Sequence, residues 1–258
     1  TSPLPLTREI NMRNPFSFAA FPSWKRVFED KSKSAQAAVY RDSLFRNAFR
    51  EELKKPAAFG NWERITVHEV RNPALKKFEG QTVAEVAAAQ GKDGVGAFLD
   101  LTLADDLDNE FTMTSFNNRV DRMAEILNNP AMLLGLGDGG AHLDMLCVSG
   151  YPTGMLGTWV REKKVLTLEE AVRRMTSDPA DFFGIKDRGR LKPGLAADIV
   201  VFSEKEVSSA GRPERLYDLP GGAKRMVMRS QGVEYTVVNG AVTWEGGIKL
   251  DPEVLYRD

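Results

Sequence analysis

Apolar and charged residues alternate at helical spacing in the first quarter of the chain. Residues 24–30 and 35–53 both show this pattern, and Pro56 marks the end of the second segment. We therefore predict an amphipathic helix over each segment. The apolar side of the second helix would consist of Leu44, Phe45, Ala48, Phe49 and Leu53.

Strict alternation follows over residues 62–70 and predicts a strand. Ile65 and Val67 would occupy one face of this strand, and His68 would lie on the other face. A histidine in that position is expected to be a surface or structural residue rather than a metal ligand.

Two segments have the spacing of a capping box, in which a threonine and a glutamate three residues later satisfy the first turn of a helix. Thr82 with Glu85 opens a predicted helix that Gly91 ends, and Thr167 with Glu170 opens another. Helical spacing also predicts helices over residues 95–103, 119–128 and 155–161.

Acidic residues cluster after the helix predicted over residues 95–103, at Asp105, Asp106, Asp108 and Glu110. Such a run can bind a cation, but the spacing matches no EF-hand loop. We therefore expect a solvated loop.

The apolar run of residues 131–136 ends in Gly137, Asp138, two further glycines and His142. A short continuous apolar run predicts a buried strand. Asp138 would stand where that strand stops, with Gly139 and Gly140 letting the backbone turn. In a (β/α)₈ barrel this is the rim that carries the chemistry. The alternative is a glycine turn capped by Asp138.

Strand signals dominate from about residue 190 onward. Residues 197–202 read as a strand, and residues 234–238 and 241–245 flank Asn239-Gly240. Asn-Gly between two alternating segments is a strong hairpin signal. The chain therefore ends in a small β-rich unit.

The composition is that of a globular protein, with 42% hydrophobic and 28% charged residues in 258. The net charge of −1 gives no electrostatic footprint for nucleic acid. We find no apolar run long enough to cross a membrane and no signal-peptide pattern at the N-terminus. Cys147, the one cysteine, excludes an internal disulfide, so we expect a reducing, cytoplasmic setting.

Only two histidines, His68 and His142, are present. A catalytic zinc usually takes three protein ligands, mostly histidines. The chain alone is therefore a poor candidate for a complete zinc site.

In three segments the chain resembles the C-terminal half of the amidohydrolase superfamily, and within it the N-acyl-D-amino-acid deacylase (D-aminoacylase) group. The segments are Gly137-Asp-Gly-Gly-Ala-His-Leu-Asp144, Leu168 to Ala180 followed by Phe183-Gly-Ile, and Asp187 to Phe202 with the closing Thr236-Val-Val-Asn-Gly-Ala241. They follow one another in the family's order.

The resemblance implies an α/β fold: the C-terminal part of a metal-dependent-hydrolase TIM barrel, with an insertion, over residues 1–189, and the C-terminal part of a small β-sandwich over residues 190–258. It also implies a zinc enzyme. Asp138 would bind the metal and act as general base. His142 would touch the substrate or brace the loop. Gly139, Gly140 and Tyr151 would line the substrate site.

The chain departs from that family in lacking the His-x-His of the first strand and the later metal histidines. We therefore expect a C-terminal fragment that is inactive alone and has the missing N-terminal half of the barrel as its partner. Apolar faces left without that half would favour a homo-oligomer. The loop after Asp138 also lacks an arginine for a substrate carboxylate.

These observations predict a metal-dependent amidohydrolase that cleaves a C–N bond of a small-molecule linear amide, of the N-acyl amino acid type. One alternative is a cyclic amidase similar to dihydropyrimidinase or hydantoinase. The other is a non-catalytic remnant without a metal site. The acyl group and the stereochemistry of the substrate are not encoded in any of these signals.

Overall fold

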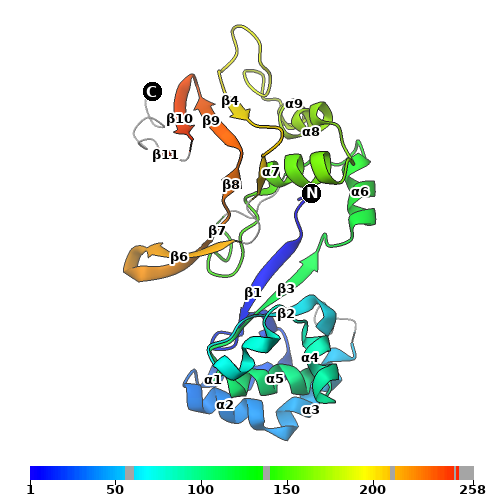
Figure 1. Ribbon diagram of the computed structural model, residues 1–258, viewed down its shortest axis with the longest axis vertical. Helices are drawn as coiled ribbons and strands as arrows, with labels where there is room; N and C mark the ends of the chain where they lie inside the picture. The colour runs from blue at the N-terminus through cyan, green and yellow to red at the C-terminus, as the bar shows by residue number, and fades with distance from the viewer. Residues whose placement is uncertain (56–60, 136–139, 210–212, 247, 250–258) are drawn as a thin grey trace. The chain divides into compact units, whose positions relative to one another are not determined.

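The computed structural model describes residues 1–55, 61–135, 140–209, 213–246 and 248–249. It divides into two compact units (Figure 1). Unit 1 comprises Thr1–Leu6 and Asn117–Asp258, and unit 2 is the intervening segment Thr7–Phe116. The domain boundary predicted near residue 190 falls inside unit 1 and stays a prediction.

Unit 2 combines one small sheet with short helices. Strands β1 (Leu6–Asn11), β3 (Glu110–Phe116) and β2 (Ile65–Glu69) lie in that order in the sheet, and β2 runs antiparallel to β3. The helices are α1 (Lys25–Glu29), α2 (Lys33–Arg41), α3 (Ser43–Leu53), α4 (Val83–Gln90) and α5 (Gly94–Ala104), with 3₁₀ turns η1 (Phe16–Phe18), η2 (Pro22–Trp24), η3 (Trp62–Arg64) and η4 (Pro73–Phe78).

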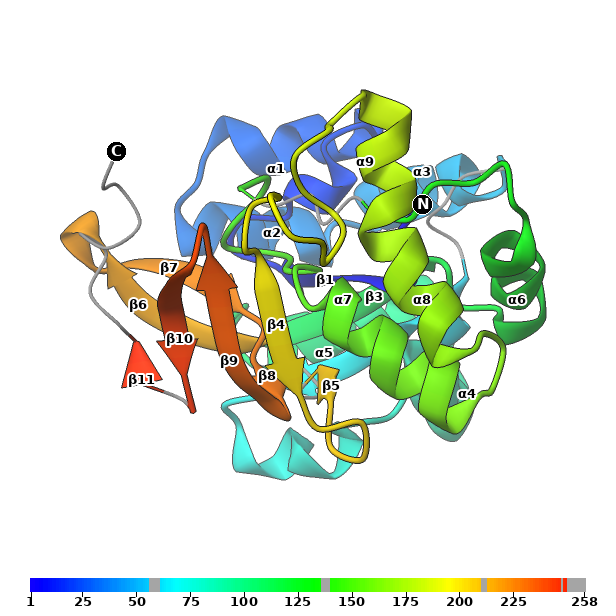
Figure 2. The same cartoon turned by 90° about the horizontal axis from the view of Figure 1, so that it is seen from above.

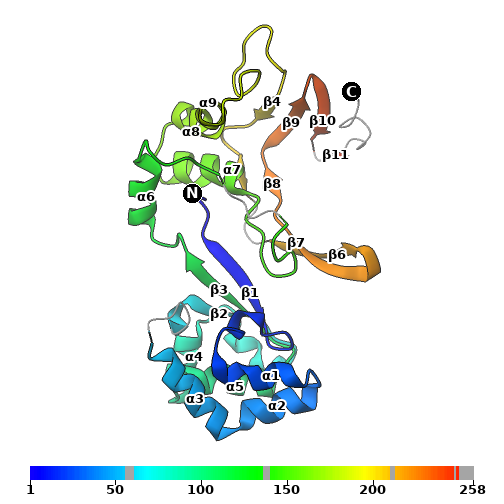
Figure 3. The ribbon, with the colours of Figure 1, turned by 180° about the vertical axis from the view of Figure 1, so that it is seen from behind.

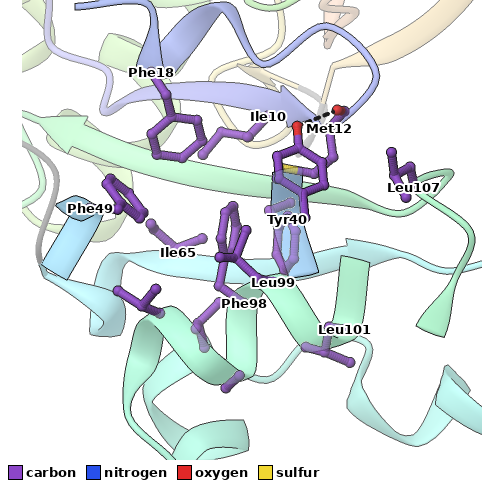
Figure 4. Close-up of a cluster of buried hydrophobic side chains, with 14 of the residues drawn as sticks. Ile10, Met12, Phe18, Tyr40, Phe49, Ile65, Phe98, Leu99, Leu101 and Leu107 are labelled. Atoms are coloured by element: carbon purple, nitrogen blue, oxygen red, sulfur yellow. Dashed lines mark hydrogen bonds between the residues drawn. The ribbon is translucent and has the colours of Figure 1, made fainter. Parts of the chain in front are cut away.

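Aromatic side chains fill the core of unit 2. Phe18 stacks on Trp24 with ring centroids 4.2 Å apart, and Phe98 packs on Phe111 at 4.4 Å. The hydroxyl of Tyr40 donates a hydrogen bond of 2.9 Å to the carbonyl of Met12 at the edge of this cluster (Figure 4). Burial of such large apolar side chains is the main stabilising term for a unit of this size.

Helix α4 of unit 2 begins where the sequence predicts a cap. Thr82 accepts from the backbone N–H of Glu85, whose carboxylate accepts from Thr82 N, so the capping box is confirmed. Gly91 ends α4 in the left-handed region, at φ 61°.

The single helix predicted over residues 35–53 is wrong, because the chain breaks at Asp42. That residue is extended, and its carboxylate caps α3 by accepting from Leu44 N. The break turns Leu44 outward, leaving it 74% exposed, whereas Phe45 and Phe49 are buried as predicted.

The strand predicted over residues 62–70 begins later than predicted, because residues 62–64 form the turn η3. Within β2, Ile65 and Val67 are buried together, as predicted. His68 is half-buried, with its Nε2 3.9 Å from Oε1 of Glu9.

The acidic run is only in part the solvated loop that we predicted. Asp105 is 3% exposed and accepts from the backbone N–H groups of Arg71 and Asn72. Asp106 and Asp108 both pair with Lys33. The run therefore joins three segments of unit 2.

The helices of unit 1 are α6 (Val120–Asn128), α7 (Tyr151–Gly154), the π-helix η5 (Met155–Glu162), α8 (Leu168–Met175) and α9 (Ser177–Phe183). Thr167 and Glu170 form the predicted capping box of α8. A buried cluster that includes Met155, Trp159 and Leu134 lies among these helices. None of the helices in the described ranges is both long and apolar enough to cross a membrane.

The strands of unit 1 form three antiparallel groups. Strands β11 (Ile248–Lys249), β10 (Ala241–Glu245), β9 (Val233–Val238) and β4 (Ile199–Phe202) make one sheet in that order (Figure 2). The others are the pair β5 (Ser208–Ser209) with β8 (Ser230–Gln231) and the hairpin β6 (Glu214–Leu219) with β7 (Ala223–Val227), whose strands are joined by the turn η6 (Pro220–Gly222).

The predicted Asn-Gly hairpin is confirmed between β9 and β10. Asn239 and Gly240 have φ of 50° and 81°, the positive values that a tight hairpin turn of this type requires. The chain thus mixes helices and strands, in agreement with the predicted α/β class, and the barrel and β-sandwich parts of that expectation stay predictions.

Candidate active site

The segment that leads toward Asp138 is fixed from both sides in unit 1. Arg174 is almost completely buried, and its guanidinium donates to the carbonyls of Leu127, Asn129 and Met132. Burial lowers the pKa of Arg174 below that of an ordinary arginine. Its three carbonyl partners compensate for the desolvation and hold the chain between α6 and residue 132.

Residues 132–135 have no regular secondary structure, in contrast to the predicted strand. Thr1 nevertheless hydrogen-bonds on both sides of Leu134: its nitrogen donates to Leu133 O at 2.7 Å, and Gly135 N donates to Thr1 O at 3.0 Å. This is the bonding pattern of neighbouring parallel strands. Leu134 itself is buried.

Two of the predicted site residues, Asp138 and Gly139, lie outside the described residues. The described chain resumes at Gly140, whose φ of +92° is one that glycine adopts readily. His142 is exposed and has a φ of +48°. Its carbonyl accepts from the N–H groups of Met145 and Leu146, which closes a turn. Gly140 and His142 therefore belong to one exposed turn.

Tyr151 lies apart from that turn, at the first position of α7. The helix is held by close backbone packing: a Cβ added to the preceding Gly150 would lie 2.3 Å from Sδ of Met228. The π-helix η5 continues from α7, and the indole of Trp159 donates to Pro3 O at 2.8 Å. The half-buried Tyr151 thus begins a well-anchored helix.

The hairpin β6–β7, on which we made no prediction, lies against the turn that contains His142. Met226 N donates a 2.7 Å hydrogen bond to Leu143 O. A signal was available in the sequence, since Pro220-Gly-Gly222 separates two segments with basic residues.

One pocket of about 270 Å³ opens beside the start of the run that precedes Asp138. It contains none of the predicted site residues, and Arg173 in its wall is already paired with Asp178 at 2.8 Å. The lining residues are Pro130, Met132, Leu133, Arg173, Arg174, Asp178, Asp181 and Phe182.

The described residues do not form a zinc site by themselves. Within the described ranges, no three His, Cys, Asp or Glu side chains are grouped so that they would hold a metal ion. His68 belongs to unit 2 and lies beside Glu9, whereas His142 belongs to unit 1. The donor set therefore does not fit zinc without Asp138 and ligands from elsewhere.

Comparison with known proteins gives a family match over most of the chain. A family model described as "Amidohydrolase family" matches residues 45–244. The N-acyl-D-glutamate deacylase of Alcaligenes xylosoxydans xylosoxydans is 36% identical over 168 residues, which are 64% of this chain and 30% of that protein. The dihydroorotase of Lactobacillus acidophilus is 32% identical over 99 residues, 35% of this chain and 21% of that protein.

Among solved structures, the chain is similar to the N-acyl-D-glutamate deacylase of Bordetella bronchiseptica, which was crystallised with zinc and a phosphonate inhibitor. The sequence identity is 26% and the TM-score 0.42, over 71% of this chain and 35% of that one. The matched part of this chain thus spans about a third or less of each of these relatives.

Proposed function

Since the chain belongs to the amidohydrolase family, we propose that it forms the C-terminal part of a hydrolase that cleaves a linear amide C–N bond of the N-acyl amino acid type. The observation that carries the proposal is the 36% identity to N-acyl-D-glutamate deacylase. The bonds that Thr1 makes on both sides of Leu134 support a barrel strand in the run before Asp138.

In this proposal Asp138 is the general base. Its carboxylate takes a proton from the attacking water and delivers it to the amide nitrogen, which must leave as a neutral amine. Gly139 and Gly140 let the backbone approach the substrate closely because they carry no side chain. His142, in its exposed turn, and Tyr151, at the start of α7, are the proposed substrate contacts.

The remaining metal ligands would come from a part of the protein that precedes this chain, together with the first part of the barrel and of the β-sandwich. Asp138 would be the one ligand that this chain contributes. Among the described residues, no group of His, Cys, Asp and Glu side chains would hold a metal ion by itself. This supports a site whose ligands are divided between this chain and another part of the protein.

Elemental analysis of the purified polypeptide tests the proposal, alone and co-expressed with the segment that its reading frame encodes upstream. We expect stoichiometric zinc and amide hydrolysis only in the combined form, and Asp138→Asn in that form should remove the hydrolysis. Tight zinc binding by the polypeptide alone would contradict the division of ligands. Absence of metal and of activity in both forms would favour the non-catalytic alternative.

A cyclic amidase is the second candidate, and the 32% identity to dihydroorotase favours it. That match covers 35% of this chain, whereas the match to the N-acyl-D-glutamate deacylase covers 64%. We therefore place the linear amide first. Activity of the combined form on dihydroorotate or a hydantoin, with none on N-acyl amino acids, would reverse this order.

A further inference from the structure

The turn between β9 and β10 contains the one Asn-Gly pair in the sequence, Asn239-Gly240. Asparagine is a chemically labile residue. It deamidates readily before glycine, because the next backbone nitrogen is not hindered by a side chain. That nitrogen attacks Cγ of the asparagine and closes a succinimide ring. The Cγ–Nδ2 bond breaks, and Nδ2 leaves as ammonia with the proton of the attacking N–H. Water then opens the ring to aspartate or isoaspartate.

Either product would change this hairpin. Isoaspartate adds one carbon to the backbone of a two-residue turn, and the length of such a turn sets the register of its strands. Aspartate adds a negative charge close to Asp198, whose Oδ1 accepts from Asn239 N at 2.9 Å. Because β9 pairs with both β10 and β4, a change at the turn reaches the whole sheet.

The turn lies beside the segment that leads into β4 (Figure 3). Strands β4 and β9 are antiparallel, with Ile199 opposite Val237, so the end of β9 neighbours the start of β4. At this place Gly240 N donates to Ala197 O at 3.0 Å. The nitrogen that would attack Cγ of Asn239 is therefore already held by a hydrogen bond that points it elsewhere.

The side chain of Asn239 is held from the same segment by Arg188. Its Nη2 donates to Oδ1 of Asn239 at 3.2 Å, and its Nη1 donates to Oδ2 of Asp198 at 2.6 Å. The other oxygen of Asp198 accepts from Asn239 N. The Arg188–Asp198 ion pair thus holds Asn239 by its side chain and by its backbone.

We infer that Asn239 is a deamidation site that the Arg188–Asp198 pair keeps closed in the folded chain. Attack requires the Gly240 nitrogen and Cγ of Asn239 to turn toward each other, which breaks these hydrogen bonds. The reaction then proceeds only from a locally opened turn, and its rate is the rate of the unfolded chain multiplied by the open fraction. This protection does not depend on the proposed function.

Peptide mass spectrometry tests the inference by following deamidation at Asn239 in the purified polypeptide. The polypeptide is incubated at mildly alkaline pH, once folded and once in urea. We expect deamidation in the folded chain to be at least about tenfold slower than in urea, because only the opened turn reacts. Equal rates in the two states would overturn the inference.

Three variants assign the protection to the ion pair. Arg188→Met removes the bond to Oδ1 and should raise the folded-state rate about fivefold, the factor that one hydrogen bond contributes, with no change in urea. Asp198→Asn keeps an acceptor for Asn239 N and should give a smaller rise. The matched control is Arg190→Met, in the same loop: Arg190 pairs with Asp181 at 2.5 Å, and its loss should leave the rate unchanged.

Urea unfolding of each variant separates protection of the turn from general stability. Equal acceleration by Arg188→Met and Arg190→Met would show that loosening of the loop controls the rate, and would overturn the inference. Slower deamidation in Arg188→Met would overturn it as well, because the guanidinium would then polarise the amide carbonyl and promote the attack.

A milder variant decides the question if Arg188→Met does not fold. Arg188→Lys keeps the charge but lacks the planar fork that holds Asn239 and Asp198 together. We expect its folded-state rate to exceed that of the wild type by about two- to fivefold, since one of the two bonds is lost. An unchanged rate in this variant would overturn the role of the pair.

Discussion

Asp105 shows that a carboxylate in an acidic run can have a structural role. Its oxygens accept from Arg71 N at 2.9 and 3.0 Å and from Asn72 N at 2.5 Å, in a buried position. Asp105→Ala leaves both N–H groups without this acceptor, so we expect unit 2 to lose about 2–3 kcal/mol of unfolding free energy. Urea denaturation measures the loss.

The matched control is Asp106→Asn, one residue further on. The Asp106 carboxylate is 81% exposed and pairs with Lys33 at 2.6 Å. Exposed ion pairs contribute little to stability, so we expect the unfolding free energy to change by less than about 0.5 kcal/mol. A large loss in both variants would mean that the backbone of the turn, rather than the Asp105 carboxylate, is the sensitive feature.

Tyr40 should make unit 2 less stable at alkaline pH. Burial raises the pKa of its phenol above the usual 10.0, and the nearby Arg13 opposes this only in part. Because the folded state favours the protonated phenol, this contribution is fully present below pH 10 and is lost as pH rises toward the folded pKa.

Tyr40→Phe tests this dependence. The substitution removes the titrating group together with the hydrogen bond to Met12 O. We expect the loss of this hydrogen bond to lower the unfolding free energy by about 1 kcal/mol at neutral pH. We expect the stability of the wild type to fall toward that of the variant as the pH rises from 10 to about 11 in urea titrations. Parallel curves over this range would show that Tyr40 does not titrate with unfolding.

The capping boxes of α4 and α8 were predictable because each depends on four consecutive residues. Thr82 accepts from Glu85 N, and Thr167 accepts from Glu170 N, both at 3.2 Å. We expect Thr82→Ala and Thr167→Ala each to cost about 1 kcal/mol, because one N–H at the helix start loses its acceptor. Thermal unfolding measures the effect.

The controls are Thr82→Ser and Thr167→Ser, which keep the hydroxyl acceptor and should remain close to the wild type. If the serine variants lose as much stability as the alanine variants, the methyl group of threonine, and not the cap, stabilises these helices.

Other elements could not be predicted from local patterns. The break at Asp42 was missed because the apolar spacing continues across it, whereas Asp42 itself favours a cap. The strand expected over residues 131–136 depends on partners outside its own sequence: among the described residues, Thr1 supplies the two ladder-like bonds. An apolar run therefore predicts only that a segment can form a strand, and the available hydrogen-bond partners determine whether it does.

At the scale of the whole molecule, the candidate site was predictable in its motif but not in its surroundings. Gly140 and His142 lie in one turn, as their spacing suggested. The contact between Met226 and Leu143 joins positions more than eighty residues apart. No pattern within either segment encodes such a contact, because only the folded chain brings them together.

Unit 2 has the properties of a segment that folds by itself. Its buried cluster draws on residues from Ile10 to Met113, all inside the unit. Its first and last strands, β1 and β3, are neighbours in one sheet, and the hydroxyls of Thr7 and Thr114 are 3.0 Å apart. A closed core with adjacent ends is what an independently stable domain requires.

We therefore expect the excised segment Thr7–Phe116 to unfold in one cooperative transition. In this segment Thr82→Ala should lower the unfolding free energy by about 1 kcal/mol, as in the whole chain, since the helix cap and the core that it supports lie within unit 2. Circular dichroism against urea measures both. A broad transition with exposed apolar surface would show instead that unit 2 needs unit 1 to pack its aromatic core.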